Sequence, residues 1–154
     1  ISSGSATHIP WIATGHKEIK TSLGLPINKR PWGTLSAINL DEGQIEWQVP
    51  LGTYPQLEKE GYSPTGTFNM GGPVVTAGGI VFIGASMDER IHAYDKYSGA
   101  LLWEFQLEAG GYATPSTYEV DGHQYLVIAG GGGGKPGTKV GDAYYCFKLP
   151  SKSK

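Results

Sequence analysis

Several side chains in this sequence belong to the types that bind metals, transfer protons or attack substrates. They are His8, His16, His92 and His123, the adjacent carboxylates Asp88 and Glu89, and the single cysteine Cys146. The histidines lack the close spacing of a metal-ligand set, so we expect surface or packing roles for them. His92 is expected inside a strand and His123 in a hairpin turn.

The carboxylates Asp88 and Glu89 fall at an expected turn between two strands. Paired carboxylates can act as a general acid and base, but a solvated turn is the better interpretation here. Cys146 lies in the apolar run Tyr144-Tyr145-Cys146-Phe147, which predicts a buried thiol on a strand. A single cysteine excludes a disulfide within the chain and a zinc site built from cysteines.

The glycine-rich run near the C-terminal end matches two phosphate-binding motifs only in part. Gly132-x-Gly134-x-x-Gly137 has the spacing of the dinucleotide-binding fingerprint, but a strand is expected after it where the motif requires a helix. Gly134-Lys135 is followed by Pro136, where a phosphate-binding loop requires Ser or Thr. Both nucleotide-binding interpretations are therefore rejected.

The composition of the 154 residues points to an all-β domain. Glycine accounts for 24 of them, about twice the usual share, and interior glycines disfavour long helices. The net charge is −2 without a basic block, which argues against nucleic acid as a partner, and no apolar run reaches the roughly 18 residues of a membrane-spanning helix. Because the chain begins at Ile1, we expect the natural N-terminus to be missing, and no signal peptide is expected in these residues.

Two segments of the chain repeat one pattern. Residues 37–47 and 93–103 both read Ala-x-(Asn/Asp)-x-x-x-Gly-x-x-x-Trp, offset by 56 residues. The pattern predicts a strand that ends at Asn39 or Asp95 and a turn whose glycine takes a positive φ. A second strand follows, which carries Trp47 or Trp103 at its middle. A tryptophan that recurs once per unit predicts packing between sheets and not catalysis.

Strands are expected around these repeats in three series. The first series covers 34–40 and 45–51, the second 72–76, 79–85, 90–96 and 101–107, and the third 113–120, 124–130 and 143–149. Series of two, four and three antiparallel strands are typical of β-propeller blades, each a four-stranded sheet packed face to face on the next. We therefore expect an all-β fold of about two and a quarter blades. Residues 1–31 are interpreted as an irregular leader, 32–150 as blades with a long loop at 52–71, and 151–154 as a tail.

The repeat resembles the tryptophan-docking motif of the PQQ-dependent dehydrogenases, which are eight-bladed propellers. Further stretches, in the family's order, are similar to its membrane-bound glucose dehydrogenase branch. They are 30–35 (RPWGTL), 47–52 (WQVPLG), 69–79 (NMGGPVVTAGG), 110–115 (GGYATP), 122–125 (GHQY), and the glycine-rich run that leads into 137–139 (GTK) and 141–143 (GDA). The resemblance covers about residues 30–150 and implies that they form the C-terminal part of such a propeller.

The resemblance implies a function for a larger parent protein. Such enzymes oxidise a sugar or alcohol hydroxyl at PQQ, which is held with Ca²⁺ or Mg²⁺ at the propeller axis. Electrons pass to ubiquinone or a cytochrome, and the location is periplasmic. The catalytic Asp, the metal ligands and most PQQ contacts of the family lie on earlier blades. The resemblance therefore implies no catalytic and no metal-binding residue in this chain, and no tight cofactor binding by this segment alone.

A few residues are implied to face the cofactor. They are Trp32, the stretch Asn69, Met70 and Gly71, and Gly133 and Gly134 of the glycine-rich run. Plain packing remains an alternative for Trp32, and a turn-capping role remains one for Asn69. Some relatives have a histidine in the glycine-rich run where this chain has only glycine, and Lys139 is interpreted as a solvated side chain more readily than as an anion contact.

Two other function classes stay open. One is a non-catalytic scaffold that binds missing blades or other copies of itself through its open sheet edges. The other is an outer-membrane assembly propeller, which also has tryptophan-bearing blades. The long loops and the 69–79 stretch argue against this second class, because scaffold propellers usually have short connections.

Overall fold

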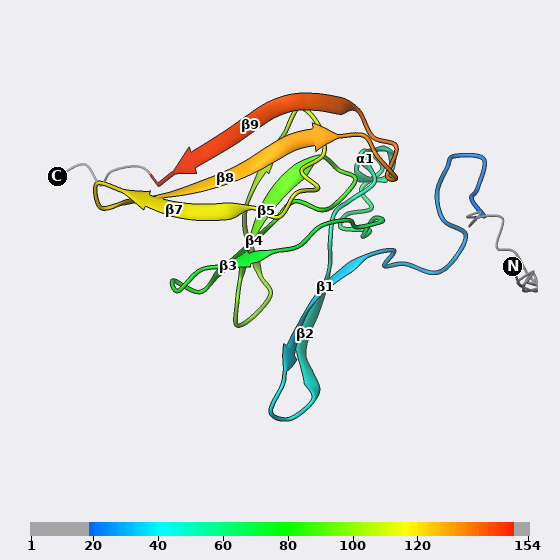
Figure 1. Cartoon of the computed structure of the whole chain (residues 1–154). Helices are drawn as coiled ribbons and strands as arrows, with labels where there is room; N and C mark the ends of the chain where they lie inside the picture. Colours follow the sequence, from blue (N-terminus) through cyan, green and yellow to red (C-terminus); the bar gives the residue numbers. More distant parts are fainter. Residues whose placement is uncertain (1–18, 150–154) are drawn as a thin grey trace, which may run out of the picture.

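The computed structural model describes residues 19–149, and the structure is all-β within them. The elements are β1 Thr34–Asn39, β2 Gln44–Pro50, α1 Pro55–Glu58, β3 Val74–Val75, β4 Ile80–Ile83, β5 Arg90–Asp95, β6 Leu101–Gln106, β7 Ser116–Val120, β8 His123–Gly132 and β9 Val140–Lys148. They form three antiparallel sheets, ordered β1-β2, β3-β4-β5-β6 and β7-β8-β9 (Figure 1). The expected series of two, four and three strands is confirmed.

Two differences concern strand lengths and loops. β3 is confined to Val74–Val75, and the loop expected at 52–71 contains the single helical turn α1. Within the described part of the leader, Lys20 and Pro26 form one isolated bridge. The predictions for His8, His16 and the tail 151–154 lie outside the described residues. Between residues 19 and 149, no helix is long and apolar enough to cross a membrane.

The turns of the two repeats are closed by their first polar side chains. Asn39 Oδ1 accepts hydrogen bonds from the N–H groups of Asp41 and Glu42, at 3.0 and 3.2 Å. Asp95 Oδ1 accepts them from the N–H groups of Tyr97 and Ser98, at 3.0 and 2.8 Å. Each turn ends at a glycine with positive φ, +67° in the first repeat and +70° in the second. The local prediction from the repeat is confirmed.

Trp47 docks the first sheet onto the turn of the second. Its indole N–H donates to the carbonyl oxygen of Lys96 at 2.9 Å. A Cβ placed on Gly99 would come within 2.6 Å of the Trp47 ring, so glycine is required there for space as well as for its φ. The packing role predicted for the tryptophan is confirmed.

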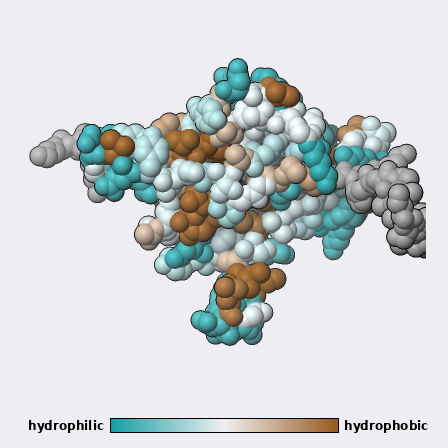
Figure 2. Space-filling model, viewed as in Figure 1, coloured by the Kyte–Doolittle hydropathy of each residue, from teal (hydrophilic) through white to brown (hydrophobic). Residues whose placement is uncertain are grey.

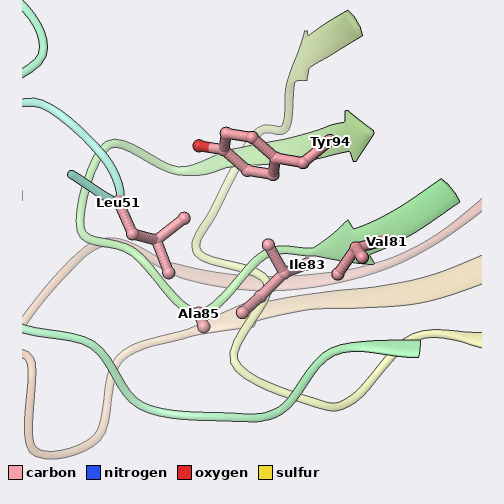
Figure 3. Close-up of a cluster of buried hydrophobic side chains, with 5 residues drawn as sticks. All are labelled: Leu51, Val81, Ile83, Ala85 and Tyr94. Carbon is pink, nitrogen blue, oxygen red and sulfur yellow. The ribbon is translucent and has the colours of Figure 1, made fainter. Parts of the chain in front are cut away.

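The central strands β4 and β5 of the second sheet pack on both faces, whereas the residues of β6 are exposed. On one face Val81, Ile83, Ala85 and Tyr94 pack with Leu51, which enters from the end of β2 (Figure 3). The other face packs against the third sheet through a second buried cluster. Its members are Ile91, Leu107, Leu126 and Ile128, with Val74, Phe82, Tyr145 and Phe147 at its margin. β4 is apolar on both faces because it lies between two neighbouring sheets.

Other apolar surfaces have no cover among the described residues. The β1–β2 hairpin projects from the other sheets (Figure 1), and hydrophobic side chains gather on it (Figure 2). Ile38, Leu40 and Ile45 on this hairpin are 58%, 89% and 59% exposed. Trp103 meets Phe147 edge to face at 5.2 Å and is still 38% exposed. Surfaces of this kind are typical of contact sites.

Cys146 corrects one expectation from the sequence. The thiol is exposed, because side chains along β9 alternate and Tyr145 and Phe147 take the inward positions. The outward face that holds Cys146 also carries Tyr144, and the hydroxyl of Tyr118 lies 3.4 Å from Sγ. An apolar run therefore did not mean burial on both faces.

Replacing Gly99 by alanine is expected to destabilise the protein more than the same replacement at Gly43. Both positions have a positive φ, so each substitution costs about 1–2 kcal/mol in backbone strain. At Gly99 the added methyl also meets Trp47, which costs roughly 1–3 kcal/mol more, whereas nothing lies within 4 Å at Gly43. Urea unfolding measures both losses, and equal losses would contradict the docking contact.

The native protein is expected to react completely with a thiol reagent at Cys146, at a rate close to that of the unfolded chain. The outward position on β9 leaves Sγ accessible to solvent. Tyr118→Phe serves as the control, because it removes the hydroxyl beside the thiol and leaves the strand in place. A thiol that reacts only after unfolding would show that this placement is wrong.

Candidate functional site

Loops from all three sheets meet at one end of the structure. They enclose a pocket of about 760 Å³. Its walls include Ile19, Lys20, Pro26, Ile27, Asn28, Trp32, Tyr54, Phe68, Met87, Lys135 and Pro136. Figure 1 shows α1 and the loop between β8 and β9 at this same end. Segments that are more than 100 residues apart in the sequence therefore contribute to one cavity.

Trp32 forms part of the pocket wall. Its indole N–H donates to the Asn28 carbonyl at 2.8 Å, and its ring meets Tyr54 edge to face at 5.4 Å. The backbone N–H of Trp32 donates to the carbonyl of Thr65 at 3.1 Å. The ring is thus held from both sides while one part of it lines the cavity.

Asn69 lies behind this wall. It pairs with Ser86 in an isolated bridge, and its amide nitrogen would be 2.4 Å from a Cβ on Gly33. Asn69 Oδ1 is buried and has no hydrogen-bond partner within the described residues. The oxygen that would cap a turn is therefore not used for capping. A buried carbonyl oxygen without a hydrogen-bond partner costs about 1–3 kcal/mol.

Met70 and Gly71 lie next to this region and are not among the residues that line the pocket. The N–H of Met70 donates to the carbonyl of Ala85 at 2.8 Å, and its side chain is 42% exposed. Gly71 has a φ of +131°, and a Cβ there would come within 2.5 Å of the Tyr112 carbonyl. Met70 and Gly71 therefore act through the course of the backbone and not through side chains in the described pocket lining.

Gly133 and Gly134 shape the loop between β8 and β9. Both have positive φ, +63° and +62°. The turn that they begin presents Lys135 to the pocket, with its ammonium 5.5 Å from the centre of the Phe68 ring. Lys139, the lysine considered from the sequence, is not in the described lining.

Trp32 is the one residue of the described pocket lining that was among the residues expected to face the cofactor. Phe68 precedes the expected stretch Asn69 to Gly71. The other lining residues, among them Tyr54, Lys135 and Pro136, were not predicted from the sequence. The aromatic residues sit in the irregular loop, where no repeat marks them. Lys135 carries the one available signal, because it follows two glycines that form a turn. The strand β9 follows this loop, in agreement with the rejection of the nucleotide-binding motifs.

Asp88 corrects a second expectation, because its carboxylate is buried and not solvated. Its side chain is 3% exposed, in the loop between β4 and β5. Burial raises the pKa of Asp88, but the nearby His92 imidazole and hydrogen bonds from Ser86 and Arg90 outweigh burial, so its pKa lies below the ordinary value. The loop folds under residues 51–54 of the preceding sheet, a contact that the local sequence does not reveal.

His92 belongs to the same buried group. Its Nε2 lies 3.3 Å from Asp88 Oδ2 and 3.7 Å from Glu104 Oε2, and its Nδ1 is buried without a partner in the described part of the chain. Arg90 binds Glu58 of α1 through two hydrogen bonds, at 2.9 and 3.0 Å. These side chains line a smaller cavity of about 340 Å³ between the first and second sheets. Among residues 19–149, no group of three or more His, Cys, Asp or Glu side chains could hold a metal ion.

Comparison with known proteins agrees with this geometry. A family described as "Glucose/ethanol/alcohol dehydrogenase, beta-propeller domain", with PQQ as its short name, matches residues 4–126. Quinoprotein glucose dehydrogenase of Escherichia coli K12 is 43% identical over 136 residues, 85% of this chain and 17% of that protein. The glycerol dehydrogenase large subunit of Gluconobacter oxydans 621H is 43% identical over 134 residues, 82% of this chain and 18% of that protein.

A solved structure shares the fold. The quinohemoprotein alcohol dehydrogenase of Comamonas testosteroni superposes with a TM-score of 0.59 at 29% identity, covering 86% of this chain and 18% of that one. The chain thus spans less than a fifth of the length of these relatives. The matched family, the identities and the shared fold agree with one another. The chain therefore belongs to the PQQ-dependent glucose, ethanol and alcohol dehydrogenase family, and its residues match the β-propeller domain of that family.

Proposed function

We propose that the chain supplies propeller blades to a periplasmic dehydrogenase that oxidises a sugar or alcohol hydroxyl at PQQ, bound with Ca²⁺ or Mg²⁺. Electrons then pass to a quinone or a cytochrome. The observation that carries the proposal is the aromatic pocket at the loop end of the sheets. Relatives named glucose dehydrogenase and glycerol dehydrogenase support a polyol or sugar as the substrate class.

The residues of the pocket fit such a cofactor. PQQ is a planar ring system with several carboxylates, and its quinone accepts the electrons that leave the substrate carbon. The rings of Trp32, Tyr54 and Phe68 offer flat apolar surface. Lys135 adds an ammonium group to the same wall, and a carboxylate of the cofactor would pair with it. Asn69 holds its amide directly behind Trp32-Gly33, where the unpaired Oδ1 marks a polar margin.

We infer that this segment positions and encloses the cofactor and does not perform the chemistry alone. Trp32 restricts the access of water to the pocket, and Lys135 orients an anionic edge. The proton acceptor and the metal ligands belong, by resemblance to the family, to other blades. Met70, Gly71, Gly133 and Gly134 contribute through the backbone turns that place their neighbours.

The unpaired docking surfaces support further blades on both sides. Gly43 has nearly the same φ as Gly99, and a Cβ on Gly43 would meet nothing within 4 Å, so it offers a turn on which a preceding tryptophan would dock. Trp103 repeats Trp47 in sequence and is half-exposed against a third sheet that has three strands. A fourth strand beside β9 would complete that sheet and cover Trp103.

A second candidate function is a scaffold that assembles through its sheet edges. The observation in its favour is the long strand β9, whose outward residues Val140 and Tyr144 are 75% and 81% exposed. An unpaired apolar edge strand is a template for another chain. A native mass equal to one chain at micromolar concentration argues against this alternative.

In the full-length enzyme that we propose, Lys135→Ala is expected to raise the dissociation constant of PQQ about tenfold. Loss of one charge-assisted contact costs about 1.4 kcal/mol or more in binding free energy. Titration of the apoenzyme with PQQ in the presence of Ca²⁺, followed by cofactor absorbance, measures the constant. Lys139→Ala is the matched control, because Lys139 is a lysine of the same loop outside the described pocket lining.

Equal affinities of the two lysine variants would contradict the assignment of the pocket wall. The isolated segment provides a second control in the same assay. With PQQ, Ca²⁺ and glucose it is expected to reduce no dye, because the proton acceptor lies elsewhere. Turnover by the segment alone would overturn our inference that it is inactive.

A further inference from the structure

We propose that Asp88 is a positioning residue that fixes Trp32 and Asn69 at the cofactor pocket. This inference rests on the proposed function, since it names what holds that pocket in shape. Asp88 itself does not line the pocket, and it acts through the segments that do.

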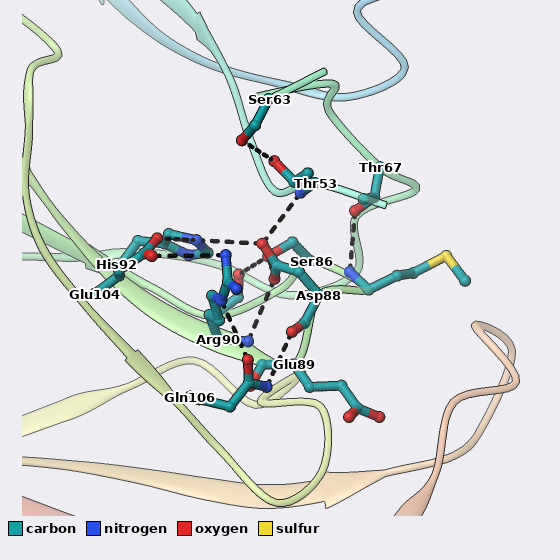
Figure 4. Close-up of polar contacts among 12 residues, drawn as sticks. Thr53, Ser63, Thr67, Ser86, Asp88, Glu89, Arg90, His92, Glu104 and Gln106 are labelled. Atoms are coloured by element: carbon teal, nitrogen blue, oxygen red, sulfur yellow. Dashed lines mark hydrogen bonds and ion pairs between the residues drawn. The ribbon is translucent and has the colours of Figure 1, made fainter. Parts of the chain in front are cut away.

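Asp88 joins the loop of the second sheet to the end of the first sheet (Figure 4). Its Oδ2 accepts the N–H of Thr53 at 3.1 Å, directly after β2. Its Oδ1 accepts the hydroxyl of Ser86 at 2.6 Å and the N–H of Arg90 at 3.3 Å. With His92 Nε2 at 3.3 Å, both oxygens of the buried carboxylate are occupied. Removing such a buried partner leaves polar groups without compensation.

The rest of the same loop holds the segment that carries Asn69. The carbonyl of Ala85 accepts the N–H of Met70 at 2.8 Å, and Ser86 pairs with Asn69. The N–H of Met87 donates to Thr67 Oγ1 at 2.9 Å. Residues 85–88 thus contact, one after another, the two segments behind the pocket.

The segments that carry Thr53 and Asn69 are coupled to Trp32 because their backbones are in direct contact. Cβ atoms on Gly33, Gly52 and Gly66 would all come within 2.5 Å of neighbouring atoms. Backbone hydrogen bonds connect the layers: Trp32 N–H to Thr65 O at 3.1 Å, Leu51 N–H to Gly33 O at 3.0 Å and Thr67 N–H to Leu51 O at 3.0 Å. With no free space between them, a shift at Thr53 displaces the wall that holds Trp32.

The shape of the loop depends on its surroundings. Ala85 and Glu89, at its two ends, have φ values of +60° and +59°, a conformation that residues with a side chain rarely adopt. Strained positions of this kind persist where neighbouring contacts hold them. Asp88, next to Glu89, provides four of those contacts.

Charged groups from three elements surround Asp88 and determine how pH acts on it. His92 and Arg90 come from β5, Glu104 from β6, and Glu58 from α1 through Arg90. The pKa of Asp88 is lowered in the folded protein. The contribution of ionised Asp88 to the stability of the folded state is therefore complete above the ordinary pKa of an aspartate. This contribution is lost as the pH falls through the lower pKa that Asp88 has in the folded protein.

The test compares Asp88→Asn with Asp142→Asn, which neutralises an exposed carboxylate on β9. Each variant carries 5-fluorotryptophan, and fluorine NMR is recorded well below the unfolding temperature. We expect Asp88→Asn to shift or broaden the Trp32 signal and leave the Trp47 signal unchanged. In the full-length enzyme, Asp88→Asn should raise the dissociation constant of PQQ about tenfold. The dissociation constant of the variant should stay above the wild-type value in both acidic and neutral buffer.

A lower unfolding temperature with an unchanged Trp32 signal and unchanged PQQ affinity would overturn the positioning role and leave the proposed function intact. If wild-type enzyme binds no PQQ, the proposed function fails, while the Trp32 signal still reports on positioning. If Asp88→Asn does not fold, Ser86→Ala replaces it, since it leaves the carboxylate in place and removes the hydroxyl that lies 2.6 Å from Asp88 Oδ1 and 3.2 Å from the Gly84 carbonyl oxygen. Ser86→Ala must move the Trp32 signal in the same way, and an unmoved signal overturns the inference.

Discussion

The docking of Trp47 onto the turn of the second sheet is the contact on which the arrangement of this structure depends. The indole fills the space above Gly99 and donates to the Lys96 carbonyl at 2.9 Å. A face-to-face stack of twisted sheets needs one large side chain and one position without a side chain at the same place. Because that contact fixes the order of the sheets, it also brings their loops to one end.

Between the sheets the contacts are apolar, whereas at the loop end the segments are held together through three glycines and one buried carboxylate. Gly33, Gly52 and Gly66 let the backbone segments touch, and Asp88 closes them against the second sheet. This close-packed layer lies behind Trp32 and Asn69, so the pocket wall is rigid where it faces the proposed cofactor. The loop that supports the fold therefore also lies behind the pocket that we propose to bind the cofactor, next to the buried Asn69 Oδ1, which has no partner within the described residues.

Much of the fold could be predicted from the sequence, because its signals are local. Alternating apolar runs mark the strands, and Asn39, Asp95 and their glycines mark turns whose hydrogen bonds form within four residues. The burial of Asp88 could not be predicted, because it comes from Thr53, 35 residues away, and not from the turn in which Asp88 sits. Cys146 was misjudged for a related reason, since its exposure depends on which face of β9 has a neighbour. The sequence could not show which of Lys135 and Lys139 lines the pocket, because the orientation of both depends on the backbone turn at Gly133 and Gly134.

Hydrogen exchange at the indole nitrogen of Trp47 tests the docking contact most directly. The sequence has four tryptophans, whose indole N–H signals are resolved by nitrogen-15 NMR. Since the Trp47 N–H is bonded to the Lys96 carbonyl between two sheets, we predict that it exchanges only when the sheets separate, far more slowly than that of half-exposed Trp103. Gly99→Ala should remove this protection. Exchange at Trp47 as fast as at Trp103 in the folded protein would contradict the account.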